Sequence, residues 1–320
     1  MSTSTLSARV HTLRYEAPDT VSVELKPAED GVQFPPHEPG SHIDLHLGNG
    51  LVRNYSVLNP CSDSGRYVVG VLKDRKSRGG SKFVHENLRV GQVLKISEPR
   101  NNFALDEAAL HSVFLAGGIG ITPMLCMLDR LLELGRTADL IYCTRSRQDA
   151  AFLEDLKFLS ARGLKVSYHF DNEEGGPPDL HALLSPYSPA THFYACGPAP
   201  MLDAFQTVCA NLNLHQVHLE RFAAPQVSQP AASEFTVELR RSSKVIQVSA
   251  GKSILDAMLD NGLLPDHSCR EGLCGACETK VLDGQVDHRD SILTAEERRA
   301  NKSMMICVSR SSSQCLVLDA

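Results

Sequence analysis

The chain has 320 residues, more than one compact core usually holds, so two or three domains are expected. Its 32 basic and 38 acidic residues give a formal net charge of −6, and no long run of lysine and arginine suggests a nucleic-acid or anionic-membrane surface. Neither a signal-like start nor a run of about 18 apolar residues is present, so we expect a soluble, cytoplasmic protein. In a reducing compartment, ten cysteines indicate metal or redox chemistry rather than a disulfide framework.

Apolar and polar residues alternate repeatedly through residues 1–104, with turn-rich segments between the runs. The runs are TVSVELKP, HIDLHLGN, RYVVGVLK and VGQVLKIS. Short strands at this spacing predict a small antiparallel β-barrel.

From residue 105 to 222, short apolar runs alternate with amphipathic stretches. The apolar runs are SVFLAGGIG, DLIYCTRS, LKVSYHFD and THFYACGP. Strands that alternate with helices predict an α/β domain with a parallel sheet covered on both faces.

Residues 223–233, AAPQVSQPAAS, are small, polar and proline-containing, and we interpret them as an interdomain linker. Beyond them, EFTVELRR and KVIQVSA predict a strand pair, and SILDAMLDNG predicts a helix with Ser253 as N-cap and Gly262 just past its end. Residues 234–320 are therefore expected to form a third, α+β domain.

Four cysteines in this last segment follow a particular spacing. Cys269, Cys274 and Cys277 lie in CREGLCGAC, and Cys307 follows in MICVS. Structural zinc sites usually use two CxxC knuckles, and only one is present, whereas CxxxxCxxC with a distant fourth cysteine is the plant-type 2Fe-2S arrangement. The small residues between these cysteines let backbone N–H groups approach the cluster sulfurs. Five other cysteines are scattered along the chain, and most of them are interpreted as small buried thiols: Cys61, Cys126, Cys143, Cys209 and Cys315.

Two glycine-containing turns follow predicted strands. AGGIGITPM, residues 116–124, leads into a helix opened by Thr122 and Pro123, where free amides and the helix dipole can bind a pyrophosphate. Its spacing is not that of the ordinary dinucleotide fingerprint. YACGPAPM, residues 194–201, repeats the same strand–turn–helix logic.

Two further segments lie in the predicted barrel. RNYSV, residues 53–57, falls where a strand would end, and KDRKSRGGSKF offers backbone amides and a hydroxyl that could cradle a phosphate. Each is a weak signal by itself, since a half-buried strand and a charged loop would look the same.

Residues 234–320 resemble a plant-type ferredoxin domain with a β-grasp fold. RNYS, GGS, GGIGITPM and CGPAPM stand in the order seen in the ferredoxin–NADP reductase superfamily. With its C-terminal ferredoxin domain, essentially the whole chain is similar to the phthalate dioxygenase reductase family. The resemblance implies a multidomain protein that passes electrons from NADH through FMN to the 2Fe-2S cluster and then to a terminal Rieske-type oxygenase.

The resemblance also implies roles for single residues. Arg53 pairs with the flavin phosphate, Tyr55 packs on the flavin ring, and Ser56 hydrogen-bonds near its N5 edge. Val71 and Lys73 meet the ring through their backbone, Gly80 and Ser81 hold the phosphate, and Phe222 covers the other ring face. On the nucleotide, the implied contacts are Gly118, Gly120, Ile121 and Thr122 at the pyrophosphate, Asp171 at the adenosine ribose, and Cys196, Gly197 and Pro198 beside the nicotinamide.

Some alternatives stay open at this point. Arg145 and Arg147 in CTRSR could pair with a 2′-phosphate, so charge alone does not exclude NADPH. A zinc-binding, non-catalytic module is a competing interpretation, and the same carriers could serve an O-demethylase or a carnitine-type monooxygenase.

The expected mechanism needs no acid–base pair or nucleophile, because the cofactors supply the chemistry. Ser56, Cys196 and Phe222 are expected near the hydride-transfer site. The partner oxygenase is expected to dock transiently on the ferredoxin domain of a monomer. The DHRD stretch, 287–290, is interpreted as a solvated turn on the surface of the ferredoxin domain, near the expected junction of the cluster with the flavin edge.

Overall fold

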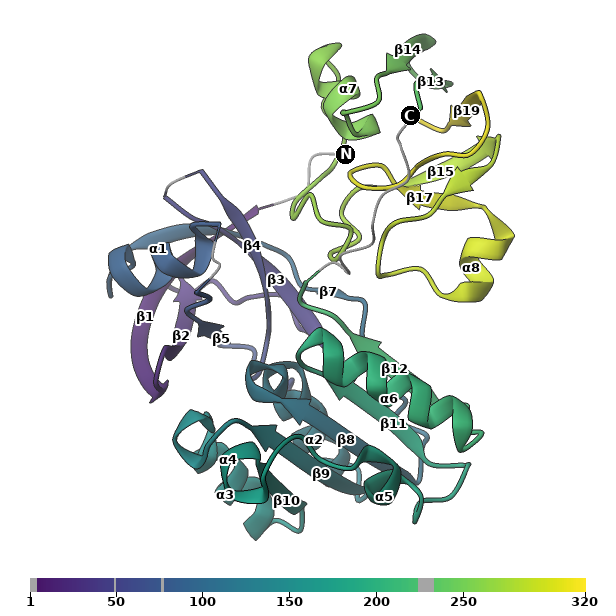
Figure 1. Cartoon of the computed structure of the whole chain (residues 1–320). Coiled ribbons are helices and arrows are strands. Elements are labelled where there is room, and N and C mark those ends of the chain that lie inside the picture. The colour runs from purple at the N-terminus through teal and green to yellow at the C-terminus, as the bar shows by residue number, and fades with distance from the viewer. Residues whose placement is uncertain (1–4, 49, 76–77, 224–232) are drawn as a thin grey trace. The chain divides into compact units, whose positions relative to one another are not determined.

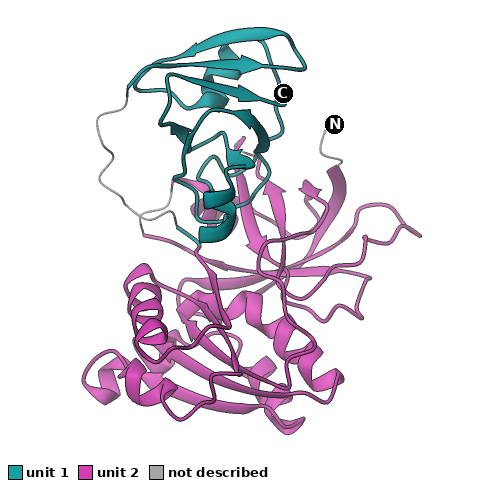
Figure 2. Cartoon of the chain, turned by 90° about the vertical axis from the view of Figure 1, so that its right-hand side faces the viewer, with its two compact units in different colours: residues 1–3, 222–320 teal, residues 4–221 magenta. Residues whose placement is uncertain are grey.

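The computed structural model describes residues 5–48, 50–75, 78–223 and 233–320. The chain divides into two compact units: a larger one, Ser4–Arg221, and a smaller one that contains Phe222–Ala320 (Figure 2). The boundary lies beside the predicted linker, although most of that linker falls outside the described residues. The predicted boundary at 104/105 stays a prediction, because both sides of it belong to one unit.

The first part of the larger unit is a curled antiparallel sheet of seven strands with the order β4-β3-β6-β1-β2-β5 and β7 beside β3 (Figure 1). Its elements are β1 (Thr5–Ala17), β2 (Thr20–Pro27), β3 (Ser41–His46), β4 (Val52–Ser56), β5 (Tyr67–Leu72), β6 (Val93–Ser97), β7 (Arg100–Asn101) and helix α1 (Gly80–Asn87). An antiparallel bridge between Val57 and Val69 brings its two edges together. The barrel-like sheet and the predicted strands β2, β3, β5 and β6 are confirmed.

The second part is a five-stranded parallel sheet with the order β10-β9-β8-β11-β12. Its strands are β8 (His111–Gly117), β9 (Thr137–Thr144), β10 (Lys165–Phe170), β11 (His192–Cys196) and β12 (Val217–Glu220). Its helices and 3₁₀ turns are η1 (Gly118–Ile121), α2 (Thr122–Glu133), η2 (Arg147–Asp149), α3 (Leu153–Ala161), α4 (Asp171–Glu174), α5 (Leu180–Leu184) and α6 (Ala199–Asn211). One core contains apolar residues of α2 and α3, and another contains those of α5 and α6, so both faces of the sheet are covered as predicted.

The two parts of this unit share apolar core. Ala17, Leu58 and Phe103, which lie in the antiparallel sheet and its loops, belong to the same buried cluster as Met124 and Leu128 of α2. A side-chain carbon on Gly40 would lie 1.9 Å from the carbonyl oxygen of Phe103, so the backbone segments are in direct contact there. This packing holds helix α2 against the antiparallel sheet.

The smaller unit is a mixed five-stranded sheet with the order β14-β13-β19-β15-β17 and a two-stranded ribbon, β16-β18. Its elements are β13 (Phe235–Leu239), β14 (Lys244–Val248), α7 (Ile254–Asp260), β15 (Glu278–Asp283), β16 (Val286–Asp287), α8 (Ala295–Ala300), β17 (Ser303–Met305), β18 (Arg310–Ser311) and β19 (Cys315–Leu318). Ser253 is the N-cap of α7 and Gly262 follows its end with a φ of 73°, as the sequence predicted. The structure adds a reciprocal capping box between Ser253 and Asp256.

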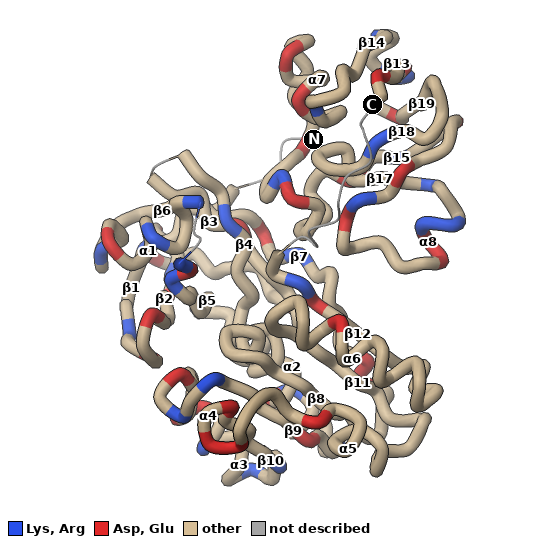
Figure 3. Tube along the Cα trace, viewed as in Figure 1, with Lys and Arg blue, Asp and Glu red and all other residues tan. Residues whose placement is uncertain are grey.

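No helix among the described residues is long and apolar enough to cross a membrane. Basic and acidic side chains alternate along the trace of both units (Figure 3). This agrees with the lack of a lysine and arginine run in the sequence.

Candidate functional site

Two glycine turns meet at the carboxyl edge of the parallel sheet. Strands β8 and β11 are neighbours, with Ala116 opposite Cys196, so the turns that follow them lie side by side. A side-chain carbon on Gly120 would lie 2.1 Å from the carbonyl oxygen of Cys196, and one on Gly197 would lie 2.9 Å from the α-carbon of Gly117. Only glycine allows this contact, and the resulting crevice lies where open α/β sheets bind nucleotides.

Helix α2 starts directly from the first turn. Gly118 has a φ of 54°, and η1 makes one tight 3₁₀ turn before the helix begins at Thr122, with Pro123 in the first turn as predicted. The Thr122 hydroxyl donates to the carbonyl oxygen of Ile119 at 2.9 Å, which fixes the entry into the helix. The structure therefore brings Gly118, Gly120, Ile121 and Thr122 together at a helix N-terminus, where a pyrophosphate fits.

Fully buried Cys196 and half-buried Glu220, whose carboxyl end is buried, form the floor beside this crevice. They face each other at the ends of β11 and β12. Burial, and then the neighbouring Glu220, raise the pKa of the Cys196 thiol well above its usual value. Oε2 of Glu220 is buried and has no hydrogen-bond partner among the described residues, and burial raises the pKa of this carboxyl to about 8. Both groups are therefore neutral at pH 7, which leaves the floor uncharged.

Sequence reasoning missed Glu220. It lies in HLERF, where a role was predicted for Phe222 alone, because a glutamate near a strand end usually faces solvent. Its position next to the predicted Phe222 was the available signal.

Replacing Glu220 with glutamine should flatten the pH dependence of stability. The folded chain keeps a proton on Glu220 up to about pH 8, whereas the unfolded chain loses it near 4.5, so the wild-type free energy of unfolding falls as the pH rises between these values. At about 1.4 kcal/mol per pKa unit the loss is at most roughly 5 kcal/mol. Urea unfolding followed by flavin fluorescence at pH 5, 7 and 8.5 measures it, with exposed Glu174→Gln as the control. Equal slopes in wild type and Glu220→Gln would contradict the assignment.

Asp171 and the two arginines lie at the other end of the same sheet edge. Asp171 begins α4 after β10, with its carboxylate 3.5 Å from Nε2 of His169. Arg147 pairs with Glu173 at 3.1 Å and lies over the Phe170 ring at 4.5 Å, so part of its charge is already compensated. Asp171 stays a predicted ribose contact.

A second constellation lies on the antiparallel sheet, where Arg53 reaches the start of α1. A side-chain carbon on Gly80 would lie 2.5 Å from Cγ of Arg53. The Arg53 guanidinium donates to the carbonyl oxygens of Val52 at 2.8 Å and Arg78 at 3.3 Å. The first turn of α1 contains no acidic residue. The basic side chain and the helix start together form a site that fits a flavin phosphate.

The other residues predicted to contact the flavin differ in how far their surroundings support that role. Ser56 is buried at the end of β4, and burial raises the pKa of the neighbouring Tyr55 to about 12. The Val71 carbonyl oxygen faces Nε2 of His85 at 3.0 Å, and the Lys73 amide donates to Asp19 at 2.7 Å. These two backbone groups already have partners, so ring contacts through Val71 and Lys73 stay predictions.

Helix α1 itself was not expected. The sequence predicted a glycine-rich loop, whereas Gly79, with a φ of 95°, is the N-cap of a helix that contains Gly80 and Ser81. The Ser81 hydroxyl accepts a hydrogen bond from the Asp74 amide at 3.1 Å. Part of the quoted segment, residues 76 and 77, lies outside the described residues.

Phe222 directly follows Arg221, the last residue of the larger unit, and is assigned to the smaller unit. Its side chain is 42% exposed. Its proposed place on the flavin ring would join residues of two units and stays a prediction.

The four predicted cluster cysteines lie in the smaller unit as two close pairs. Hydrogen bonds join Cys269 to Cys274 and Cys277 to Cys307, and all four side chains are buried. A 2Fe-2S cluster takes two thiolates on each iron, so two pairs fit it better than a single zinc ion, which needs four ligands around one centre.

Backbone amides point at these sulfurs. The Glu271 amide donates to Cys269 at 3.3 Å, and the Cys269 amide donates to Cys274 at 3.5 Å. The backbone of Gly272 also hydrogen-bonds Cys307. Such bonds stabilise negative charge on the cluster and help to set its potential, as the small residues of the loop suggested.

The DHRD stretch is not a solvated turn, which corrects the sequence interpretation. Asp290 is buried and accepts hydrogen bonds from the amides of Ile292 at 3.1 Å and Leu293 at 2.9 Å. A side-chain carbon on Gly272 would lie 3.0 Å from the α-carbon of Asp290. Asp290 therefore packs against the cluster loop at Gly272, and its carboxylate is bound by backbone amides.

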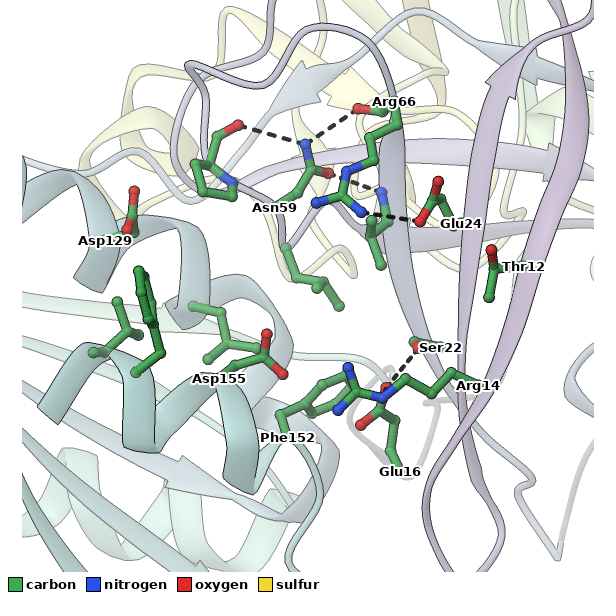
Figure 4. Close-up of a pocket in the computed structure, with 16 residues that line it drawn as sticks. Thr12, Arg14, Glu16, Ser22, Glu24, Asn59, Arg66, Asp129, Phe152 and Asp155 are labelled. Carbon is green, nitrogen blue, oxygen red and sulfur yellow. Dashed lines mark hydrogen bonds and ion pairs between the residues drawn. The ribbon is translucent and has the colours of Figure 1, made fainter. Parts of the chain in front are cut away.

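A pocket of about 330 Å³ lies between β1, β2 and helices α2 and α3 (Figure 4). Asn59, Arg66, Asp129, Phe152 and Asp155 are among its lining residues, which carry charges of both signs. None of the predicted flavin, nucleotide or cluster residues lines it.

Comparisons with known proteins agree with this arrangement. The family of oxidoreductase NAD-binding domains matches residues 114–207, and the family of 2Fe-2S iron-sulfur cluster binding domains matches residues 237–312. The first match contains all eight residues predicted to contact the dinucleotide. The second contains all four predicted cluster cysteines.

Similar full-length proteins are known. Phenoxybenzoate dioxygenase subunit beta of Ectopseudomonas oleovorans is 44% identical over 98% of this chain and 97% of its own. Tetrachlorobenzoquinone reductase of Sphingobium chlorophenolicum is 44% identical over 99% and 98%. The crystal structure of phthalate dioxygenase reductase, described as a modular structure for electron transfer from pyridine nucleotides to [2Fe-2S], superposes with a TM-score of 0.72 at 34% identity, covering 99% of this chain and 98% of that one.

Fold and site together define an electron-transfer oxidoreductase that uses NAD(H), a flavin and a 2Fe-2S cluster. The chain belongs to the phthalate dioxygenase reductase family.

Proposed function

We propose that this chain is the NADH-dependent reductase component of a Rieske-type oxygenase. The observation that supports it most directly is the combination in one chain of the Gly120–Cys196 crevice, the Arg53–Gly80 phosphate site and the paired cluster cysteines. The related dioxygenase subunit of Ectopseudomonas oleovorans favours an oxygenase as acceptor. When bound, the cofactors accept a two-electron hydride and release electrons singly, and the protein supplies position and electrostatics.

The residues of this chain have separable tasks. The glycine turns let the dinucleotide backbone approach, and the neutral Cys196–Glu220 floor avoids a buried charge beneath the nicotinamide position. Arg53 and the start of α1 would hold the flavin phosphate, and Tyr55 and Ser56, on the same strand as Arg53, would contact the ring. The four buried cysteines would hold the cluster.

The first test is a visible spectrum of anaerobically purified protein titrated with NADH. Flavin and iron–sulfur bands should both bleach, and denaturation should release FMN. A colourless protein, or a cluster that stays oxidised while the flavin bleaches, would contradict the proposed electron path.

FMN is the flavin that the resemblance to the phthalate dioxygenase reductase family implies, and Arg53 at the start of α1 is its expected phosphate contact. Arg53→Ala should weaken flavin binding by about tenfold to a hundredfold, since a charge-assisted phosphate contact is lost. Fluorescence titration of the apoprotein with FMN measures the change, and Arg89→Ala, at the other end of α1, is the matched control because its bonds go to the local carbonyls of Glu86 and Leu88. Unchanged FMN affinity in Arg53→Ala would remove Arg53 from the site.

A quinone reductase is a second candidate, favoured by the relative from Sphingobium chlorophenolicum. The two candidates differ in the electron acceptor. The rate of reduction of a chlorinated benzoquinone, compared with that of an oxygenase encoded nearby, distinguishes them. When the reductase is combined with that oxygenase, the product formed separates a dioxygenase from an O-demethylase or a carnitine-type monooxygenase.

We further infer a monomer that docks transiently through its ferredoxin domain and works in the cytoplasm, where NADH is supplied and thiols stay reduced. Light scattering of the purified protein, alone and with the oxygenase, tests the monomer and the lifetime of the complex.

A further inference from the structure

Two cysteines outside the electron path lie against each other. Sγ of Cys61 is 3.3 Å from Sγ of Cys126, although the residues are 65 positions apart. Cys61 lies in the loop between β4 and β5, and Cys126 lies on α2, so the pair joins the antiparallel sheet to the nucleotide domain within the larger unit. Cys126 is buried, as the sequence suggested for most of the scattered cysteines, but its contact with partly exposed Cys61 was not predicted.

One face of helix α2 contacts the antiparallel sheet and its loops along its whole length. Thr122, Cys126 and Glu133 recur at helical spacing. A side-chain carbon on Gly70 would lie 2.5 Å from Cγ2 of Thr122, and Glu133 accepts a hydrogen bond from Ser62 at 3.4 Å. The two sulfurs therefore lie between fixed contacts, and a disulfide needs the sulfurs to approach by only about 1.3 Å.

The two thiols differ in the way that a redox pair requires. Cys61 is partly exposed, whereas Cys126 is fully buried. The hydrogen bond from Cys126 lowers the pKa of the Cys61 thiol, with Arg130 nearby, and the same bond and burial raise the pKa of Cys126. Cys61 is therefore the thiol that an oxidant can reach, and Cys126 is the protected second thiol.

A metal site is the competing use of this cluster, because His37 lies beside the two cysteines. Nε2 of His37 is 3.9 Å from Sγ of Cys126 but 3.0 Å from the carbonyl oxygen of Asn59. A carbonyl oxygen only accepts hydrogen bonds, so Nε2 carries the proton and is not available to a metal. Nδ1 of the same ring is buried and has no hydrogen-bond partner among the described residues. A metal would have to bind through Nδ1 and the two sulfurs, and the zinc content of the protein distinguishes that use from a disulfide.

We propose that Cys61 and Cys126 form a reversible, peroxide-sensitive disulfide that locks helix α2 to the antiparallel sheet. Hydrogen peroxide first oxidises the Cys61 thiolate to a sulfenic acid, releasing hydroxide. The Cys126 thiol then attacks that sulfur, forms the S–S bond and releases water, so two thiols and one peroxide give one disulfide and two waters. Peroxide can arise locally, because dioxygen that takes two electrons from a reduced flavin yields it. The proposal does not depend on which oxygenase the chain serves.

Peptide mapping tests the disulfide directly. Trypsin places Cys61 alone in residues 54–66 and Cys126 alone in residues 101–130, separate from every cluster cysteine. After the holoprotein is treated with peroxide and alkylated without reductant, we expect these two peptides to be covalently linked, and dithiothreitol to separate them. Thermal unfolding of the linked protein should shift upward by several degrees, since the bond closes a long loop.

Matched variants complete the test. Cys61→Ser and Cys126→Ala should each abolish the linked peptide and the thermal shift, whereas Cys315→Ser, which removes an exposed thiol of the other unit, should leave both unchanged. Peroxide-treated wild type with both peptides still alkylated, or with Cys61 as sulfinic acid and no link, would overturn the proposal. Retention of one zinc ion that Cys61→Ser loses would also overturn it in favour of a metal site.

Discussion

Cys277→Ser is expected to abolish NADH-driven reduction of cytochrome c while NADH still reduces the flavin. Cys277 is 4% exposed and pairs with Cys307, so an oxygen in place of its sulfur removes one of the two thiolates expected on one iron. Stopped-flow absorbance should show flavin bleaching at close to the wild-type rate, because the flavin and nucleotide motifs lie in the other unit. Cytochrome c reduction should fall by about two orders of magnitude or more, because the carrier that passes single electrons onward is lost.

The control is Cys315→Ser, which removes a thiol from the same unit at an exposed position on β19. It should keep the iron–sulfur bands and both activities. Reduction of ferricyanide, which takes electrons directly from the flavin, checks that the larger unit is folded in both variants. If Cys277→Ser retained its iron–sulfur spectrum and its cytochrome c activity, the four-cysteine assignment would be wrong.

Local patterns predicted much of the fold because the physics that they report is local. Helix α7 is an example, since Ser253, Asp256 and Gly262 carry its start and stop signals within ten residues and the structure uses all three. The cluster spacing is equally local, apart from Cys307. The parallel sheet follows from apolar runs that match β8, β9, β10 and β11.

For β1 and α1, two of the elements that the sequence analysis did not predict, the reasons can be identified. Strand β1 contains irregularities between Val10 and Thr12 and between Tyr15 and Ala17, so its apolar residues do not keep a strict alternation. Helix α1 begins at Gly80 and buries only Gly80 and Val84, which is too little apolar periodicity to distinguish it from a loop.

Features of the site that depend on tertiary contacts could not be read from the sequence. The raised pKa of Glu220 follows from packing around its carboxyl group, and no neighbour in HLERF indicates it. The Cys61–Cys126 contact depends on α2 lying against a loop 65 residues earlier. The buried Asp290 likewise owes its environment to the cluster loop, whereas its own segment, DHRD, has the composition of a surface turn.

Gly120→Ala is expected to cause the second large loss, and to do so at the nucleotide site alone. The added methyl group would lie 2.1 Å from the carbonyl oxygen and 2.4 Å from the carbonyl carbon of Cys196, and these are backbone atoms that cannot rotate away. One of the two turns must shift, and displacement of a reacting pair by about 1 Å costs about a hundredfold in rate.

We therefore expect kcat/KM for NADH to fall by about a hundredfold in Gly120→Ala, while FMN content and the dithionite-reduced cluster spectrum stay normal. Steady-state ferricyanide reduction at varied NADH measures the loss. Gly65→Ala is the matched control, because its nearest neighbour, a carboxylate oxygen of Asp63, would lie at an ordinary 3.7 Å. A folded Gly120→Ala protein with wild-type kcat/KM would show that the dinucleotide does not use the crevice between the two turns, since any ligand that follows the Gly118–Thr122 backbone must respond to a displaced turn.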